Sequence, residues 1–331
     1  MDPITHLTAG ALLAQSLKRH FTKRYFFFFL VLAAWIPDLD NVVSLGNPEL
    51  FLIHHRGITH SLAGGLVIAV LLAGIFRLII KSFPFWWGVV TGYAGILGHI
   101  YLDVITTYGT QIFLPFNRNR YFFPGVFIID PIYTLVMLII LYCSFRRPTQ
   151  RVRLAVLGLC WILLYPMSNL GIGAILRHQV EDRLTLRQVS YTRVHLVPDL
   201  LTPIFWKVIV ETPATYHLAG LSLVHLDRDL QFRSFQKADK GWIASFAPRA
   251  HIFDTYAWFV LFPVVEREER PDGQTLIFSD LRYFPTLDLA SKYYRGKNKP
   301  LSLKAFLNPN GGLIGYEYFR PGRAGFTQRL E

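Results

Sequence analysis

The chain has 331 residues, of which 52% are hydrophobic and 15% aromatic, and its formal net charge is +12. This apolar content is high for a soluble protein and predicts a protein that resides in a lipid bilayer. The positive charge does not indicate a nucleic-acid partner, because Lys and Arg fall in short runs at the ends of apolar segments, as in membrane proteins. Cys143 and Cys160 lie inside apolar runs, which predicts no disulfide framework, and the opening Met-Asp-Pro predicts no cleaved signal peptide.

Two short apolar helices are predicted at the N-terminus. Asp2 and Pro3 form a helix-start signal before the apolar run 4–17, and a second apolar run covers 25–36 before Pro37. Both runs are shorter than the roughly 20 residues of a simple transmembrane span. We therefore expect a re-entrant or protein-covered helical pair rather than two lipid-exposed spans.

Four longer apolar segments follow and are predicted to be clear transmembrane spans. They cover residues 62–80, 85–106, 126–145 and 154–176. Residues 107–124 are predicted to form a loop whose aromatic residues, together with Arg118 and Arg120, suit a membrane interface. The sequence thus predicts an α-helical integral membrane domain over residues 1–176.

The composition changes at about residue 177, where short alternating apolar runs begin. The runs that favour strands include 205–212, 221–226, 258–265 and 276–284. Turns are predicted at Asp272-Gly273 and at residues 310–312. Residues 177–331 are therefore predicted to form a β-rich soluble domain.

The basic runs predict how the chain crosses the membrane. If the runs at 18–24, 77–81 and 146–153 face the cytoplasm, the intervening segments place every His and Asp candidate described below on the opposite side. The same count places the C-terminal domain outside the cytoplasm. The exceptions are Arg118 and Arg120, which we interpret as groups that meet an anionic part of a ligand.

A metal site is predicted from His and Asp residues that recur within the apolar segments. His99 and Asp103 are four residues apart, so a helix places their Cβ atoms about 5–6 Å apart on one face. An ionisable pair inside an apolar span is costly and is by default functional. The alternative is a His-Asp hydrogen bond that only ties two helices together.

A second group of candidate ligands lies in the connection before residue 62. His55 and His60 flank Gly57 in a turn that enters a helix, where their imidazole nitrogens could converge. His54 could replace His55, and the alternative for the whole motif is a polar interfacial loop.

Asp38 and Asp40 follow Pro37 in a turn, where carboxylates also serve ordinary turn and capping chemistry. His6 becomes a candidate ligand only because of the other candidates around it. Asp130 precedes a proline and so carries a helix-start signature, with a role in the site as the alternative. Four histidines of the C-terminal region lack metal-type spacing and are expected to be structural: His195, His217, His225 and His251.

The segments MDPITHLTAG, WIPDLDN, HHRGITHS and GHIYLD resemble the signature segments of the YdjM-type family of LexA-regulated, membrane-bound hydrolases, which are described as metal-dependent. The resemblance covers about the first 180 residues. That family is in turn similar, in its order of His and Asp, to the zinc-dependent phospholipase C and single-strand nuclease group.

The resemblance implies a helical zinc site in a bacterial inner membrane. The implied ligands are Asp38 or Asp40, His60, His99 and Asp103, with His6 or His55 serving a neighbouring ion. The chain lacks the second His-x-x-x-Asp motif and the mature N-terminal amine ligand of the phospholipase group, so one or two ions are expected rather than three.

The predicted chemistry follows from the ion. Neutral His and anionic Asp favour Zn²⁺, although Mn²⁺ or Fe²⁺ also suits these ligands. Such an ion lowers the pKa of bound water to about 7 and polarises a phosphoryl or acyl oxygen. Whichever of Asp38 and Asp40 is not a ligand would accept the water proton. The predicted substrate is a membrane lipid or lipid-linked ester or phosphoester.

Two alternative functions stay open at this point. One is a membrane transporter or channel whose His and Asp side chains bind a permeating metal, which would place those side chains along a pore. The other is a non-catalytic membrane assembly protein whose C-terminal domain binds partners.

Overall fold

The computed structural model describes residues 1–43, 46–287, 299–319 and 325–330. It divides into two compact units. The helical unit consists of Met1–Val43, His54–Ile172 and Leu200–Pro203, and the β-rich unit of Ser44–Ile53, Gly173–Asp199 and Ile204–Glu331. The division at Ile172 falls inside one long helix.

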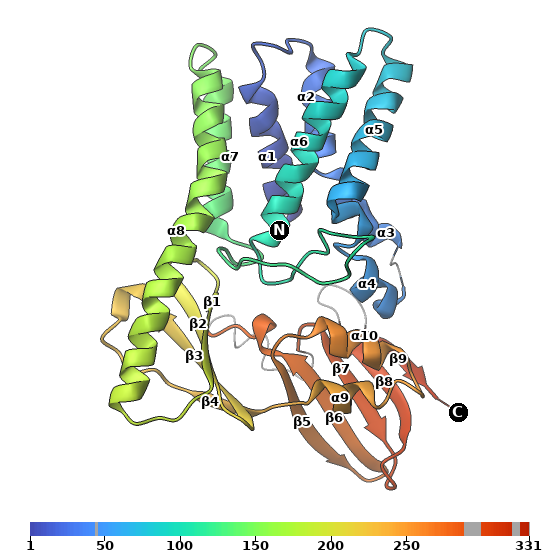
Figure 1. Ribbon diagram of the computed structural model, residues 1–331, viewed down its shortest axis with the longest axis vertical. Coiled ribbons are helices and arrows are strands. Elements are labelled where there is room, and N and C mark those ends of the chain that lie inside the picture. Colours follow the sequence, from blue (N-terminus) through green and yellow to red (C-terminus); the bar gives the residue numbers. More distant parts are fainter. Residues whose placement is uncertain (44–45, 288–298, 320–324, 331) are drawn as a thin grey trace. The chain divides into compact units, whose positions relative to one another are not determined.

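The helical unit is built from α-helices connected by turns and loops (Figure 1). Its α-helices are α1 (Pro3–Ser16), α2 (Arg24–Ala33), α3 (Asp40–Val43), α5 (Leu62–Ile79), α6 (Phe85–Val104), α7 (Pro131–Arg146) and the first part of α8 (Arg151–Leu186). Two 3-10 turns, η1 (Ile36–Leu39) and η2 (Ile58–His60), connect them. The helix start predicted at Asp2 is confirmed, because its carboxylate accepts the Thr5 N–H at 3.1 Å.

The prediction of four clear spans is wrong. Within the described residues, two helices are long and apolar enough to cross a membrane, α5 and α8. A third span is possible if α2 and the segment Ile36–Val42, which are bent by 54°, count as one. Helix α6 has 20 residues, but its glycines and the buried His99 and Asp103 lower its mean hydropathy, and α7 has only 16 residues.

Helix α1 is covered by protein, as predicted for the N-terminal pair. Nine of its 14 residues are buried, and it packs against α2, α6 and α7. The approach to α2 is close at Gly10, where an added Cβ would lie 2.6 Å from Ala34 Cβ. The polar face of α1 can therefore contribute to a site inside the helical unit.

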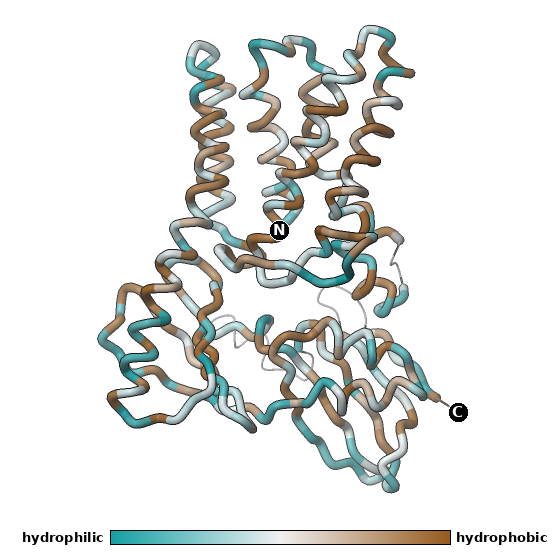
Figure 2. The backbone as a smooth tube through the Cα atoms, in the orientation of Figure 1, coloured by the Kyte–Doolittle hydropathy of each residue, from teal (hydrophilic) through white to brown (hydrophobic). Residues whose placement is uncertain are grey.

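The two ends of the helical unit differ in charge. The α1–α2, α5–α6 and α7–α8 connections, which carry the basic runs, lie at one end (Figure 1). The N-terminus, η1, η2 and the loop after α6 lie at the other, and the helices between are largely apolar (Figure 2). Which end faces the cytoplasm stays a prediction.

The β-rich unit contains two antiparallel sheets, which confirms the β-rich C-terminal part. The first sheet has the order β1 (Arg193–Pro198), β2 (Phe205–Glu211), β3 (Thr215–Ser222) and β4 (Arg233–Gln236). The second has the order β5 (Pro263–Arg270), β6 (Gly273–Asp280), β7 (Ser302–Leu307), β8 (Leu313–Phe319) and β9 (Phe326–Arg329). Further elements are α4 (Pro48–His54), α9 (Lys240–Ala244), α10 (Ile252–Phe259), η3 (Leu223–His225) and η4 (Leu281–Tyr283).

The predicted strands are confirmed only in part. The run 205–212 is β2 and both predicted turns occur, but three other runs change conformation along their length. β3 and β6 each end in a 3-10 turn, which Ser222 and Asp280 begin by accepting the N–H two residues on. The run 258–265 begins in α10 and becomes strand only at Pro263. Local capping therefore overrides the alternation of apolar residues.

Candidate metal centre

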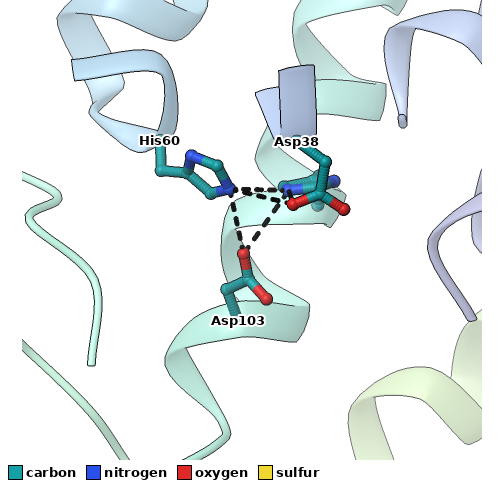
Figure 3. A group of neighbouring side chains, drawn as sticks. Asp38, His60 and Asp103 are labelled. Atoms are coloured by element: carbon teal, nitrogen blue, oxygen red, sulfur yellow. Dashed lines mark hydrogen bonds and ion pairs between the residues drawn. The ribbon is translucent and has the colours of Figure 1, made fainter. Parts of the chain in front are cut away.

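Four of the predicted ligands converge at one point of the helical unit. One ligand atom each from Asp38, His60, His99 and Asp103 lies within 4.8 Å of the others. Figure 3 shows the Asp38, His60 and Asp103 side chains pointing toward one another. His60 Nε2 lies 3.1 Å from Asp103 Oδ2 and 3.6 Å from Asp38 Oδ1. His99 Nε2 lies 3.4 Å from Asp103 Oδ2 and 3.7 Å from Asp38 Oδ1, and the two Nε2 atoms are 2.9 Å apart.

Three of these side chains are spaced as ligands of one ion. Ligand bonds of about 2.0–2.2 Å imply ligand-to-ligand edges of about 3.3–3.6 Å in a tetrahedron, and the separations among His60 Nε2, His99 Nε2 and Asp103 Oδ2 are 2.9–3.4 Å. Asp38 Oδ1 lies further away, 3.6–3.7 Å from the two Nε2 atoms. His99 is already in the tautomer that binds metal, because its Nδ1 must donate to Ala34 O, 2.7 Å away. Its Nε2 lone pair therefore points at the other three ligand atoms.

The turn that carries His60 is held against the start of α5. Ser61 caps this helix by accepting the Gly64 N–H at 2.9 Å. A Cβ at Gly64 would lie 1.9 Å from Ile58 O, so only glycine permits this approach. The close packing fixes the direction of the His60 ring.

Asp40 and His55 lie behind His60 rather than among the four converging atoms. Asp40 Oδ2 is 3.3 Å from His60 Nδ1 and accepts the Arg56 N–H at 2.8 Å, while its Oδ1 lies 3.0 Å from His55 Nδ1. Thr59 Oγ1 is also 2.9 Å from His60 Nδ1. A carboxylate behind a ligating histidine is the usual means of orienting the ring.

Arg56 is a site residue that the sequence analysis missed. Its Nη2 lies 2.7 Å from Asp103 Oδ1, and its Nη1 donates to Asp103 O and to Thr106 Oγ1. The Met1 amino group also pairs with Asp103 Oδ1. One Asp103 oxygen is thus held by Arg56 and the Met1 nitrogen, and the other faces the histidines. The available signal was the position of Arg56 inside the HHRGITHS segment.

His6 lies at the edge of the group. Its ring stacks on His99 with centroids 3.7 Å apart, and its Nε2 is 3.4 Å from Asp103 Oδ1. Neither ring nitrogen has a hydrogen-bond partner among the described residues. His6 therefore borders the oxygen that Arg56 and Met1 already hold.

The electrostatics of the centre favour a cation. Burial lowers the pKa of His55 to about 4, so this side chain is neutral at pH 7. Burial also acts to lower the pKa of His60, but hydrogen bonds to Asp103, Asp38 and Asp40 raise it to about 10. The carboxylates around His60 thus favour positive charge at this point, which a divalent ion can supply.

The remaining candidates lie outside the centre. His54 is exposed, and Asp130 caps α7 by accepting the Tyr133 N–H at 3.1 Å. In the β-rich unit, His195 lies 3.2 Å from Glu211, His217 contacts Thr215, and His251 pairs with Glu49. Among the described residues, no histidine of the β-rich unit lies in a metal-type cluster.

Comparison with known proteins places the chain in a family. The family model of the YdjM inner membrane protein matches residues 1–180, more than half of the chain. The chain belongs to the YdjM family. The matched part contains all four converging residues. It also contains two of the candidate spans, α5 and the bent pair of α2 with Ile36–Val42, and so identifies a membrane protein.

One curated relative, the uncharacterized protein YfhP of Bacillus subtilis (strain 168), is 30% identical over 83 residues. That match spans 25% of this chain and 25% of the relative. No solved structure matches the chain. The similarity of the YdjM family to the zinc-dependent phospholipase C and nuclease group stays a prediction.

Proposed function

We propose that this YdjM-family protein is a membrane-bound, metal-dependent hydrolase. It would use the ion to activate water against an ester or phosphoester of a lipid or lipid-linked substrate at the outer face of the inner membrane. The observation that supports this proposal is the convergence of Asp38, His60, His99 and Asp103 in a buried part of the helical unit.

Three of these side chains are suited to hold the ion. His60, His99 and Asp103 are at most 1% exposed in their side chains, whereas Asp38 is 15% exposed. Three protein ligands and one open position are typical of catalytic zinc. When bound, the ion would supply a Lewis acid and lower the pKa of water to about 7.

The chain's own residues have distinct roles in this proposal. Asp38 lies on the accessible side of the group, so its carboxylate would accept the proton of the attacking water. Asp40 would orient His60 through Nδ1 and take no part as a ligand. This assignment separates the two aspartates that the sequence leaves equivalent.

The geometry favours a single ion. A second ion beside His6 would have to share Asp103 Oδ1 with the guanidinium of Arg56. Like charges at these distances repel. We therefore assign His6 the role of packing against the His99 ring.

The metal content of the purified protein tests the site. Wild type in detergent should hold about one Zn²⁺ per chain, and His99→Ala or Asp103→Ala should bind it at least tenfold more weakly, since even the loss of a residue that only orients a ligand costs about 10 to 100-fold. His54→Ala is the matched control, because this neighbouring imidazole is exposed. Unchanged zinc affinity in both ligand variants would refute the site.

Turnover tests the reaction. Asp38→Asn keeps the shape but removes the base, so it should retain metal and lower kcat about 10² to 10⁴-fold toward lipid phosphoesters or esters in micelles. A transporter would be indicated instead if metal-loaded wild type hydrolyses no substrate but carries metal across vesicle membranes, and if His99→Ala abolishes that flux. A wild-type protein that binds no metal and hydrolyses no substrate would indicate an assembly protein.

A further inference from the structure

The loop between α6 and α7, residues 107–124, exposes large aromatic side chains next to the candidate metal centre. Phe113 is 44% exposed, Phe116 89% and Phe123 59%. Phe113 and Phe116 are three residues apart, and exposed apolar residues that gather in one segment mark a membrane or protein contact. The loop therefore needs an apolar partner.

The loop is fixed to the elements that carry the site. Gln111 N donates to Arg56 O at 3.0 Å, and Phe123 N donates to Val104 O, one residue after Asp103, at 2.7 Å. Thr110 and Tyr121 pair with each other through both backbone hydrogen bonds. The exposed aromatic residues thus have a defined position relative to the centre.

The same loop is hydrogen-bonded to the end of a candidate span. Leu62, the first residue of α5, donates its N–H to Ile112 O at 3.0 Å. Leu66 and Val67, one turn further along α5, are exposed apolar residues of a helix suited to cross the bilayer. Ile112 therefore lies beside the first residue of a candidate span.

The charge of the loop specifies the partner. The sequence between Asp103 and Asp130 contains Arg118 and Arg120 and no acidic residue. Arg120 donates to Gly109 O and to His55 O and stacks over Tyr108, so it holds the loop in place. Arg118 is exposed two residues from Phe116 and is free to face an anionic headgroup.

We propose that the loop 107–124 lies in the headgroup region of the bilayer, with Phe116 at the acyl boundary and Arg118 facing lipid phosphate. Aromatic and basic residues are the usual anchors at this level. The loop would then hold the opening of the metal centre in the membrane plane, so that the substrate enters from the lipid. Only this last step rests on the proposed hydrolase function.

A depth measurement tests the placement directly. In the full chain with Cys143→Ser and Cys160→Ser, a nitroxide label is attached through Phe116→Cys, and the protein is reconstituted in vesicles of phosphatidylethanolamine and phosphatidylglycerol. The control is a label at Phe232→Cys, an exposed apolar position of the β-rich unit. The ratio of oxygen to nickel-chelate accessibility should be several-fold higher at 116 than at 232. Equal ratios, or a label at 116 that neither reagent reaches, would overturn the proposal.

Turnover then separates this proposal from the proposed function. Phe113→Ala combined with Phe116→Ala should lower hydrolysis of a vesicle-embedded phosphoester several-fold and leave a water-soluble short-chain phosphoester unchanged. An equal loss on both substrates would contradict the role of the loop in substrate entry. If wild type cleaves neither substrate, the hydrolase proposal fails, while the depth measurement still decides whether the loop is in the bilayer.

Discussion

The two units both bury charged side chains, but they satisfy them differently. In the helical unit, Asp103 Oδ2 faces two metal-type ligands, His60 Nε2 at 3.1 Å and His99 Nε2 at 3.4 Å. In the β-rich unit, Asp280 is equally buried, yet it accepts from Leu261 N at 2.7 Å and from both N and Nε of Arg282 at 2.9 Å. The first carboxylate meets side chains that can bind a metal with it, and the second meets donors of the surrounding fold.

Lys207 extends the contrast within the β-rich unit. It is fully buried, its Nζ donates to Arg282 O at 2.8 Å, and burial lowers its pKa. Asp280, Arg282 and Lys207 are each hydrogen-bonded to neighbouring residues of the β-rich unit. Burial of charge alone therefore does not indicate function, whereas the convergence of His and Asp ligand atoms on one point does.

The largest effect that tests this contrast is expected at Asp280. Asp280→Ala should destabilise the β-rich unit by about 3–5 kcal/mol, because it leaves the buried guanidinium of Arg282 without its carboxylate. Hydrogen exchange of peptides from β6, measured on the full chain in micelles, reports this loss. Metal affinity should stay at the wild-type value.

Asp272→Ala provides the control for Asp280. Its carboxylate is exposed and lies 3.2 Å from Arg270, so its removal should cost about 0–1 kcal/mol. If the two variants lower the stability of the β-rich unit by the same amount, the buried Asp280 has no structural role of the kind described. A loss of metal in Asp280→Ala would contradict the purely structural role of Asp280.

A smaller effect is expected at Asp40, the carboxylate behind His60. Asp40→Asn removes the negative charge that orients His60 Nδ1 and should weaken metal binding about 10 to 100-fold without abolishing it. Asp130→Asn is the matched control, since this buried carboxylate caps α7 and asparagine caps helices equally well. Competition with a chelator of known affinity measures both variants, and equal affinities in the two would remove Asp40 from the site.

The fold was predictable where local signals are strong. Asp2 and Pro3 begin α1 as their residue types require, and the apolar run at 62–80 is α5. Hydropathy failed for α6, because this helix carries His99 and Asp103 among its apolar residues. It failed for α7 because the helix begins only at Pro131 and has 16 residues. The assignment of residues 44–53 to the β-rich unit depends on tertiary packing, which no local pattern reports.

The sequence predicts which residues belong to the candidate site, but it does not predict which of them are ligands and which lie behind the ligands. The spacing of His99 and Asp103 predicts a shared face, and their ligand atoms lie 3.4 Å apart. Asp38 and Asp40 are two residues apart, and only the 3-10 turn η1 decides that the first meets the ligand group while the second lies behind His60. The contribution of Arg56 depends on its backbone φ of 59°, a local conformation that its sequence does not reveal.

The smallest effect concerns how α4 is held within the β-rich unit. Glu49 of α4 pairs with His251 and accepts the Thr255 hydroxyl at 2.9 Å. The hydrogen bond to Glu49, with smaller help from the charge of Asp254, raises the pKa of the exposed His251 above its ordinary value of 6.5. Because the folded pKa exceeds the unfolded one, the stabilisation is fully present below about pH 6.5 and is lost as the pH rises through the folded value.

The attachment of α4 should therefore weaken between mildly acidic and alkaline pH. Hydrogen exchange of a peptide that covers α4, compared between wild type and His251→Ala at each pH, removes the intrinsic pH dependence of exchange. Wild type should be better protected than the variant below about pH 6.5 and should approach it at higher pH, by a small margin because the pair is exposed to solvent. Since α4 joins the segment of Asp38 and Asp40 to that of His55 and His60, a metal affinity that follows the same pH difference would show that the β-rich unit influences the centre through this helix. Equal protection of the two proteins at every pH would show that Thr255 alone holds Glu49, and a constant difference would show that the contribution of His251 does not depend on its charge.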